Sequence, residues 1–170
     1  MKRIALLFAL LACAADAAAC SLILSGEFRV SRRMSTVAPS AVTVRASSVE
    51  PWVEGCDAGI MVVQLAGKSR ALLMRQGYEV RPLSGVRAED VFPPGPLAPQ
   101  AMDADSVSLS WGWHAITPDD DGHVRLRFQI VPVSRSGSPG AAIEVCASTD
   151  DSVPCADPMT DDISQAINAS

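Results

Sequence analysis

The chain has 170 residues, 48% of them hydrophobic, and its formal net charge at pH 7 is −5. This length predicts one domain, and the apolar share is enough for a hydrophobic core. The acidic balance, without a basic stripe, argues against nucleic acid and against anionic membrane surfaces as partners.

The first residues have the pattern of a signal peptide. A short basic region precedes an apolar stretch at 4–14, and the small residues that follow suit signal peptidase. We therefore expect a signal peptide over 1–19 and a periplasmic or secreted mature protein. The alternative is a membrane-anchored lipoprotein, because residues 10–13 resemble the lipobox of bacterial lipoproteins, with Cys13 as the lipidated residue. No later apolar run approaches the roughly twenty residues of a transmembrane helix, so none is expected in the mature chain.

Four further cysteines predict disulfide bonds in an exported protein: Cys20, Cys56, Cys146 and Cys155. An oxidising compartment favours pairing of this even set, and three pairings are possible. Cys146 and Cys155 are the easiest to join, because only a short loop separates them, and this pairing leaves Cys20 with Cys56. Free thiols are the alternative. A zinc site is disfavoured, because close C-x-x-C pairs are missing.

Residues 20–40 mix apolar and basic character and form an N-terminal segment ahead of the first predicted strand. Three strands then follow from apolar alternation or β-branched composition. They lie at 41–46, 59–65 and 78–82. Between the second and third, residues 71–74 fit either a helical turn or a strand.

Residues 84–105 have the composition of a long loop. Loops of this length are uncommon inside a compact domain, so we expect it to contain a helical turn at 88–91 or an irregular edge strand. The tail at 149–170 has at most a weak helix.

The stretch 106–145 supplies much of the predicted core. Apolar residues of one parity run through 107–113 and again through 124–130, and a period of two places them on one face of each strand. Trp111 and Trp113 are therefore expected to point into the core. Trp52 stands outside any alternation and is the better candidate for an exposed tryptophan, although a tryptophan packed in a loop is the commoner case.

We expect this stretch to form three consecutive antiparallel strands, with the tryptophan strand and the Phe128 strand as neighbours. The turn between them contains Pro118 and Gly122, and a second loop at 134–140 is rich in serine and glycine. Pro132 cannot donate to a strand ladder, so a bulge or a sheet edge is expected near it.

The count is about seven strands, which predicts an all-β, immunoglobulin-like antiparallel sandwich over 41–148. Residues 126–145, LRFQIVPVSRSGSPGAAIEV, resemble the last two strands of a fibronectin type III domain, with Gly137, Ser138 and Pro139 in the loop between them. The resemblance implies a sandwich topology and a binding or spacer role, and it implies no functional residue.

A weak candidate for a metal site is the turn between the two central strands. His114 and His123 would face each other across it, with Asp120 nearby, and imidazole and carboxylate both bind divalent ions. The alternative, a solvated hairpin tip, is favoured because two ligands do not make a tight site.

No catalytic constellation is visible, because no serine lies in a Gly-x-Ser-x-Gly elbow and the chain has only two histidines. The sequence therefore predicts an exported, non-catalytic module without a cofactor, which binds an unknown protein or envelope component or has a structural role. The alternatives are a periplasmic metal-binding carrier and a pilus- or adhesin-type subunit.

Overall fold

The protein folds into two antiparallel sheets with almost no helix, as the sequence predicts for an all-β chain. The computed structural model describes residues 23–31, 33, 37–50, 58–83, 91–114, 118 and 121–150. Its elements are β1 (Val42–Glu50), β2 (Gly59–Gly67), α2 (Arg70–Leu73), β3 (Gly77–Pro82), β4 (Gln100–Ala101), β5 (Ser106–Trp113), β6 (Arg125–Val133) and β7 (Ile143–Ser148).

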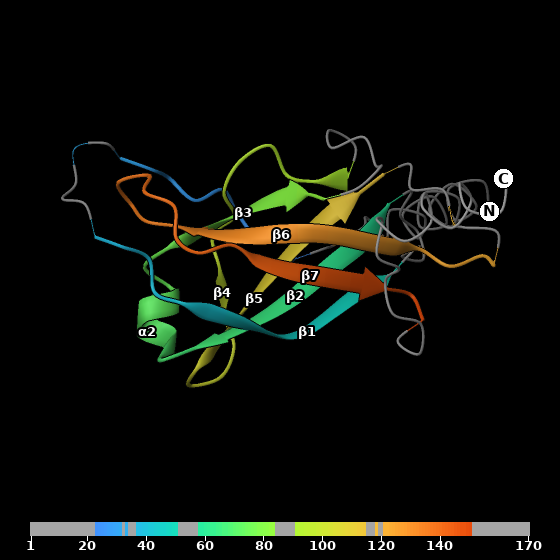
Figure 1. Cartoon of the computed structure of the whole chain (residues 1–170), viewed down its shortest axis with the longest axis horizontal. Helices are drawn as coiled ribbons and strands as arrows, with labels where there is room; N and C mark the ends of the chain where they lie inside the picture. Colours follow the sequence, from blue (N-terminus) through green and yellow to red (C-terminus); the bar gives the residue numbers. More distant parts are fainter. Residues whose placement is uncertain are drawn as a thin grey trace, which may run out of the picture.

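One sheet has the strand order β1-β2-β5-β4 and the other has the order β3-β6-β7 (Figure 1). Every pairing of neighbouring strands is antiparallel. β2 is one of the two central strands of the first sheet, and alternate residues from Met61 to Leu65 are fully buried on the face toward the second sheet. The two sheets therefore enclose one core between their facing surfaces.

The prediction that the tryptophan strand and the Phe128 strand are neighbours is wrong. β5 pairs with β2 and β4, whereas β6 pairs with β3 and β7, so the two strands belong to different sheets. Trp111 and Phe128 nevertheless meet, with ring centroids 5.8 Å apart in an edge-to-face arrangement. Alternation along a strand specifies which face is buried. Two strands with this pattern can bury that face side by side in one sheet, or from opposite sheets across the core.

The inward orientation of both indoles is confirmed. Trp111 is 4% exposed and Trp113 is 2% exposed. The Trp111 Nε1–H donates a hydrogen bond of 2.9 Å to the carbonyl of Val91, and the neighbouring Phe92 ring packs on Phe128. The long segment after β3 thus returns to the core at 91–92 and closes one side of it.

Pro132 lies near the end of β6, the central strand of its sheet. The ladder between β6 and β7 ends at the pair Ile130 and Ile143. Beyond it the Pro132 carbonyl accepts a hydrogen bond of 2.7 Å from the Gly140 N–H. Because the N and C=O of a strand residue point to the same side, the missing N–H of Pro132 faces a loop instead of a strand. The sheet edge that the sequence predicts near Pro132 therefore exists only at this end of β6, where no strand pairs with that side of Pro132.

The predicted loop at 84–105 contains a short edge strand, β4, as one of the two expected possibilities. Leu97, which precedes β4 in the sequence, exchanges two backbone hydrogen bonds with Tyr78 on β3, at 3.0 and 2.9 Å. Residues 97–101 therefore pair first with the edge of one sheet and then with β5 in the other. The segment crosses from one sheet to the other along the side of the sandwich where β3 and β4 lie.

Residues 23–31 of the N-terminal segment pack along this same side. Glu27 bridges to Leu97, the Ser25 N–H donates to the Ser110 carbonyl at 2.8 Å, and Phe28 is 8% exposed. An added Cβ on Gly77 would lie 2.3 Å from the Phe28 ring, so only glycine admits this close approach. The segment extends both sheets at their open edges.

Candidate binding cleft at the loop-bearing end

Three connections meet at one end of the sandwich. They are the β2–β3 connection at 68–76, which contains α2, the β4–β5 turn at 102–105 and the β6–β7 loop at 134–142. Figure 1 shows α2 and the β6–β7 loop at the same end of the molecule. The Arg70 N–H donates to the Ala104 carbonyl at 3.0 Å, which ties the first connection to the second. We call this the loop end.

A cleft of about 520 Å³ opens at the loop end. Three separate parts of the chain line it: the segment before β1, the β2–β3 connection and the start of the β6–β7 loop. The lining residues are Val37, Ala38, Pro39, Ser40, Leu72, Arg75, Gln76, Ser134 and Arg135. This volume lies within the usual range of small-ligand sites.

Gln76 holds one wall of the cleft in place. Its side chain is 3% exposed and its Oε1 accepts a hydrogen bond of 2.7 Å from the Ser40 N–H. Its Nε2 donates to the Ser40 carbonyl at 3.2 Å and to the Tyr78 hydroxyl at 3.1 Å. Both amide hydrogens of Gln76 are therefore used inside the protein, and the side chain fixes the segment before β1 against the β2–β3 connection.

Tyr78 continues this network into the core. Its ring is fully buried and its hydroxyl donates to the Leu73 carbonyl at 3.2 Å. Burial raises the pKa of Tyr78 to about 12, and the hydrogen bond from Gln76 lowers it in part. The hydroxyl is thus a neutral structural donor at any physiological pH, which makes it unsuited to proton transfer.

The β6–β7 loop is held by its own serines. Ser134 is 6% exposed and its Oγ accepts a hydrogen bond of 3.0 Å from the Ser138 N–H, while the Ser134 and Ser136 hydroxyls are 2.8 Å apart. Gly137 has a φ of 88°, a backbone conformation that favours glycine. The loop predicted at 134–140 is therefore an ordered turn, and it forms the second wall of the cleft.

Gly140 brings the loop against the opposite wall. A Cβ added to it would lie 3.1 Å from the Pro39 Cβ, which is closer than most such contacts in proteins. The glycine thus lets the β6–β7 loop and the segment before β1 approach closely.

Charge at the loop end is divided between paired and unpaired groups. The Arg45 guanidinium on β1 lies 3.4 Å from the Asp103 carboxylate and 3.0 Å from the Asp105 carboxylate. It therefore forms ion pairs with both acidic residues of the β4–β5 turn. Arg75 and Arg135, which line the cleft, are exposed and form no ion pair with any residue in the described ranges. The cleft is therefore bordered by positive charge.

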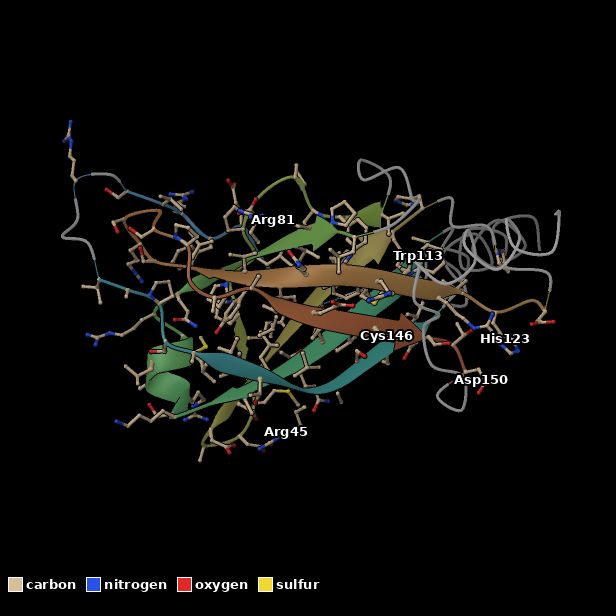
Figure 2. All side chains as sticks on the ribbon, viewed as in Figure 1. Arg45, Arg81, Trp113, His123, Cys146 and Asp150 are labelled. Carbon is tan, nitrogen blue, oxygen red and sulfur yellow. The ribbon has the colours of Figure 1, made fainter. Side chains whose placement is uncertain are left out.

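The two histidines of the predicted metal site lie elsewhere. His123 is at the end of the molecule opposite α2, where its Nε2 lies 3.9 Å from the Asp150 carboxylate and its Nδ1 lies 3.5 Å from the Thr149 hydroxyl (Figure 2). β5 and β6 belong to different sheets, so the hairpin expected to carry His114 and His123 is wrong, while the metal site itself stays a prediction. Among the described residues no group of three or more His, Cys, Asp or Glu side chains could hold a metal ion.

Several predicted residues fall outside the described part of the chain: Cys13, Cys20, Cys56, Cys155, Asp120 and Trp52. Cys146 lies on β7, and its carbonyl accepts a hydrogen bond of 2.7 Å from the Ser47 hydroxyl on β1. The pairing of the four cysteines and the lipidation of Cys13 stay predictions.

The sequence alone did not indicate the cleft. Arg75 and Arg135 lie 60 positions apart in different connections, and nothing in their local pattern separates them from other surface arginines. Gln76 is a polar residue directly before β3, and only the structure shows that it is buried. A buried amide beside a strand end indicates a polar network that fixes a loop.

Comparison with protein-family models, with curated proteins and with solved structures found no match to this chain. The fold and the cleft are therefore the basis for any functional proposal. In the ranges that the structure describes, no helix has both the length and the apolar character needed to cross a membrane.

Proposed function

We propose that the protein is an exported, non-catalytic β-sandwich module that binds a partner in the cell envelope through its loop end. The observation that carries the proposal is the cleft, because two walls from distant parts of the chain are fixed around it by internal hydrogen bonds. A fixed cleft loses little conformational entropy when a partner binds, which favours affinity.

The strand order supports an immunoglobulin-like topology. If β1 to β7 are lettered A to G, the sheets become A-B-E-D and C-F-G, which is the order of seven-stranded immunoglobulin constant-type domains. The last two strands, β6 and β7, are also paired antiparallel as expected for the fibronectin type III resemblance. In such folds the loops that cluster at one end of the sandwich are the usual recognition surface.

A pilus-type subunit is less favoured than a binding module. That reading needs an incomplete sandwich with an open position for a donated strand. Here β7 already pairs with β6 over six residue pairs, from Arg125 and Ser148 to Ile130 and Ile143. The metal-carrier reading has no support from a ligand cluster in the described residues.

Site-specific photo-crosslinking in the cell that makes the protein tests the proposal. Met74 at the loop end and Leu83 beyond the far end of β3 are each 38% exposed, so they form a matched pair of positions. A photoreactive amino acid at 74 should give a discrete adduct with an envelope protein, and the same group at 83 should not. Adducts from 83 alone, or from neither position in the exported protein, would contradict a partner at the loop end.

A further inference from the structure

The loop end has a charge opposite to that of the chain as a whole. The three connections carry Lys68, Arg70, Arg75 and Arg135, and their two acidic residues both lie within 3.4 Å of Arg45. The whole chain has a net charge of −5. A positive region on an acidic protein attracts negative groups and sets the orientation in which they arrive.

The donors that a ligand in the cleft could use are the two arginines. The Gln76 amide hydrogens are taken by Ser40 and Tyr78, and the Ser134 hydroxyl is bound within its own loop. Arg75 and Arg135 have no ion pair in the described ranges, and they lie on different walls of the cleft. A guanidinium presents parallel N–H groups that match the two oxygens of a carboxylate.

The loop end also carries exposed apolar side chains. Val37 in the cleft wall is 66% exposed, Met74 next to Arg75 is 38% exposed, and Met102 in the β4–β5 turn is 39% exposed. Arginine and methionine together are typical of the contact surfaces of protein partners. A free inorganic anion has no apolar part to cover these side chains, whereas a peptide with acidic and apolar residues does.

We infer that the cleft takes the carboxylate side chain of an acidic, partly apolar segment of a partner protein, held between Arg75 and Arg135. The inference rests on the proposed function, since it names the chemistry of the partner at the same loop end. Neighbouring apolar residues of the segment then cover Val37 and Met74. Binding is expected to weaken as salt is added, because the arginines are exposed to solvent.

The test uses the full mature chain and a fluorescently labelled octapeptide of alternating aspartate and leucine, with the asparagine–leucine peptide as the neutral control. Arg75→Gln and Arg135→Gln should each weaken binding of the acidic peptide about fivefold to tenfold, as loss of one partly exposed charged hydrogen bond implies. Lys68→Gln removes an equal charge from the same end outside the cleft lining, and it should change binding less than twofold, as expected for a charge without contact to the ligand. Fluorescence anisotropy gives the dissociation constants of the wild type and of the three variants.

Each alternative outcome overturns the inference. Equal binding of the neutral peptide, no binding of the acidic peptide at millimolar concentration, or an equal loss for Lys68→Gln would show that no specific carboxylate site exists. Inorganic phosphate that competes as well as the acidic peptide would assign the site to a free anion, and tighter binding to vesicles of phosphatidylglycerol would assign it to a membrane surface.

Two controls separate failure of this inference from other failures. Circular dichroism and thermal unfolding of each variant should match the wild type, because both arginines are exposed and bear no internal contacts through their guanidinium groups in the described ranges. If position 74 still gives its crosslinked adduct when both arginines are replaced by glutamine, the binding module stands and the carboxylate site fails.

Discussion

The two core tryptophans give a matched test of the buried hydrogen bond to Val91. Trp111→Phe and Trp113→Phe remove the same atoms from two side chains that are 4% and 2% exposed. The Trp111 Nε1–H donates to the Val91 carbonyl at 2.9 Å. The Trp113 Nε1–H is buried and has no hydrogen-bond acceptor within the described part of the chain. The two substitutions therefore differ mainly in this one bond.

Both variants lose part of an aromatic side chain from the core. This loss of packing lowers the free energy of unfolding by about 1 to 2 kcal/mol. Trp111→Phe also leaves the Val91 carbonyl without its donor, and an unsatisfied buried group costs about 1 to 3 kcal/mol. Trp113→Phe instead removes a buried donor that lacks an acceptor, so part of its packing loss is offset. We expect Trp111→Phe to be less stable than Trp113→Phe by about 2 kcal/mol.

Urea unfolding of the two variants, followed by far-UV circular dichroism, measures this difference without relying on the altered indoles. The slope with urea should be the same for both variants, because the surface exposed on unfolding hardly changes. Equal stabilities, or a lower stability for Trp113→Phe, would refute the assignment of the hydrogen bond as the source of the difference.

Three further predictions concern the tyrosine network, the cleft wall and processing. Tyr78 is the only tyrosine of the chain, so absorbance at alkaline pH should show one phenol that titrates near 12 in the folded protein and near 10 when unfolded. Because its folded pKa is raised, its contribution to stability is complete below pH 10 and falls by about 1.4 kcal/mol per pH unit between 10 and 12, a fall that Tyr78→Phe should lack. Gly140→Ala should be less stable than Gly95→Ala by about 1 kcal/mol, because an added Cβ meets Pro39 at 3.1 Å in the first case and nothing within 4 Å in the second, and equal stabilities would contradict the contact. Intact mass of the protein from the producing cell should correspond to a chain that begins at Cys20 and has lost four hydrogens through two disulfides, whereas a lipid adduct on Cys13 would establish the lipoprotein alternative.

Strand positions could be predicted from the sequence because alternation and β-branched composition are local signals. The predicted strand at 59–65 corresponds to β2 at Gly59–Gly67, and the predicted strand at 78–82 corresponds to β3 at Gly77–Pro82. In each case the buried face of the strand has apolar residues at every second position. β4 had no such signal, because a strand of two residues is too short to alternate.

Strand neighbours could not be predicted, because pairing depends on the path of the connections and not on the faces. The pattern of β5 and β6 is the same whether they lie side by side or across the core, and only the strand pairing distinguishes the two arrangements. The segment 71–74 was ambiguous for a related reason. It became the helical turn α2 because Leu73, fully buried, packs over Gly67 at the end of β2, where a Cβ would lie 2.8 Å from the Leu73 side chain.

The cleft depends on contacts that are distant in sequence. Ser40 and Gln76 are 36 positions apart, and their two hydrogen bonds exist only once β1 and β3 are in place. Arg135 joins them from a third connection. Composition and spacing do not indicate which distant residues will line one cleft. The sequence patterns therefore predicted the two-sheet fold but not the cleft on which the proposed function rests.

The early segment at 23–31 reaches its partners only after most of the chain is present. Ser25 bonds to Ser110, Phe28 bonds to Pro96, and the Ser31 N–H donates to the Arg135 carbonyl at 2.7 Å. Without this segment the Ser110 carbonyl of β5 lacks its donor, and exposed strand edges recruit other chains. A chain truncated before residue 32 should therefore self-associate more than the full chain does, because it leaves backbone groups of β5 without this cover.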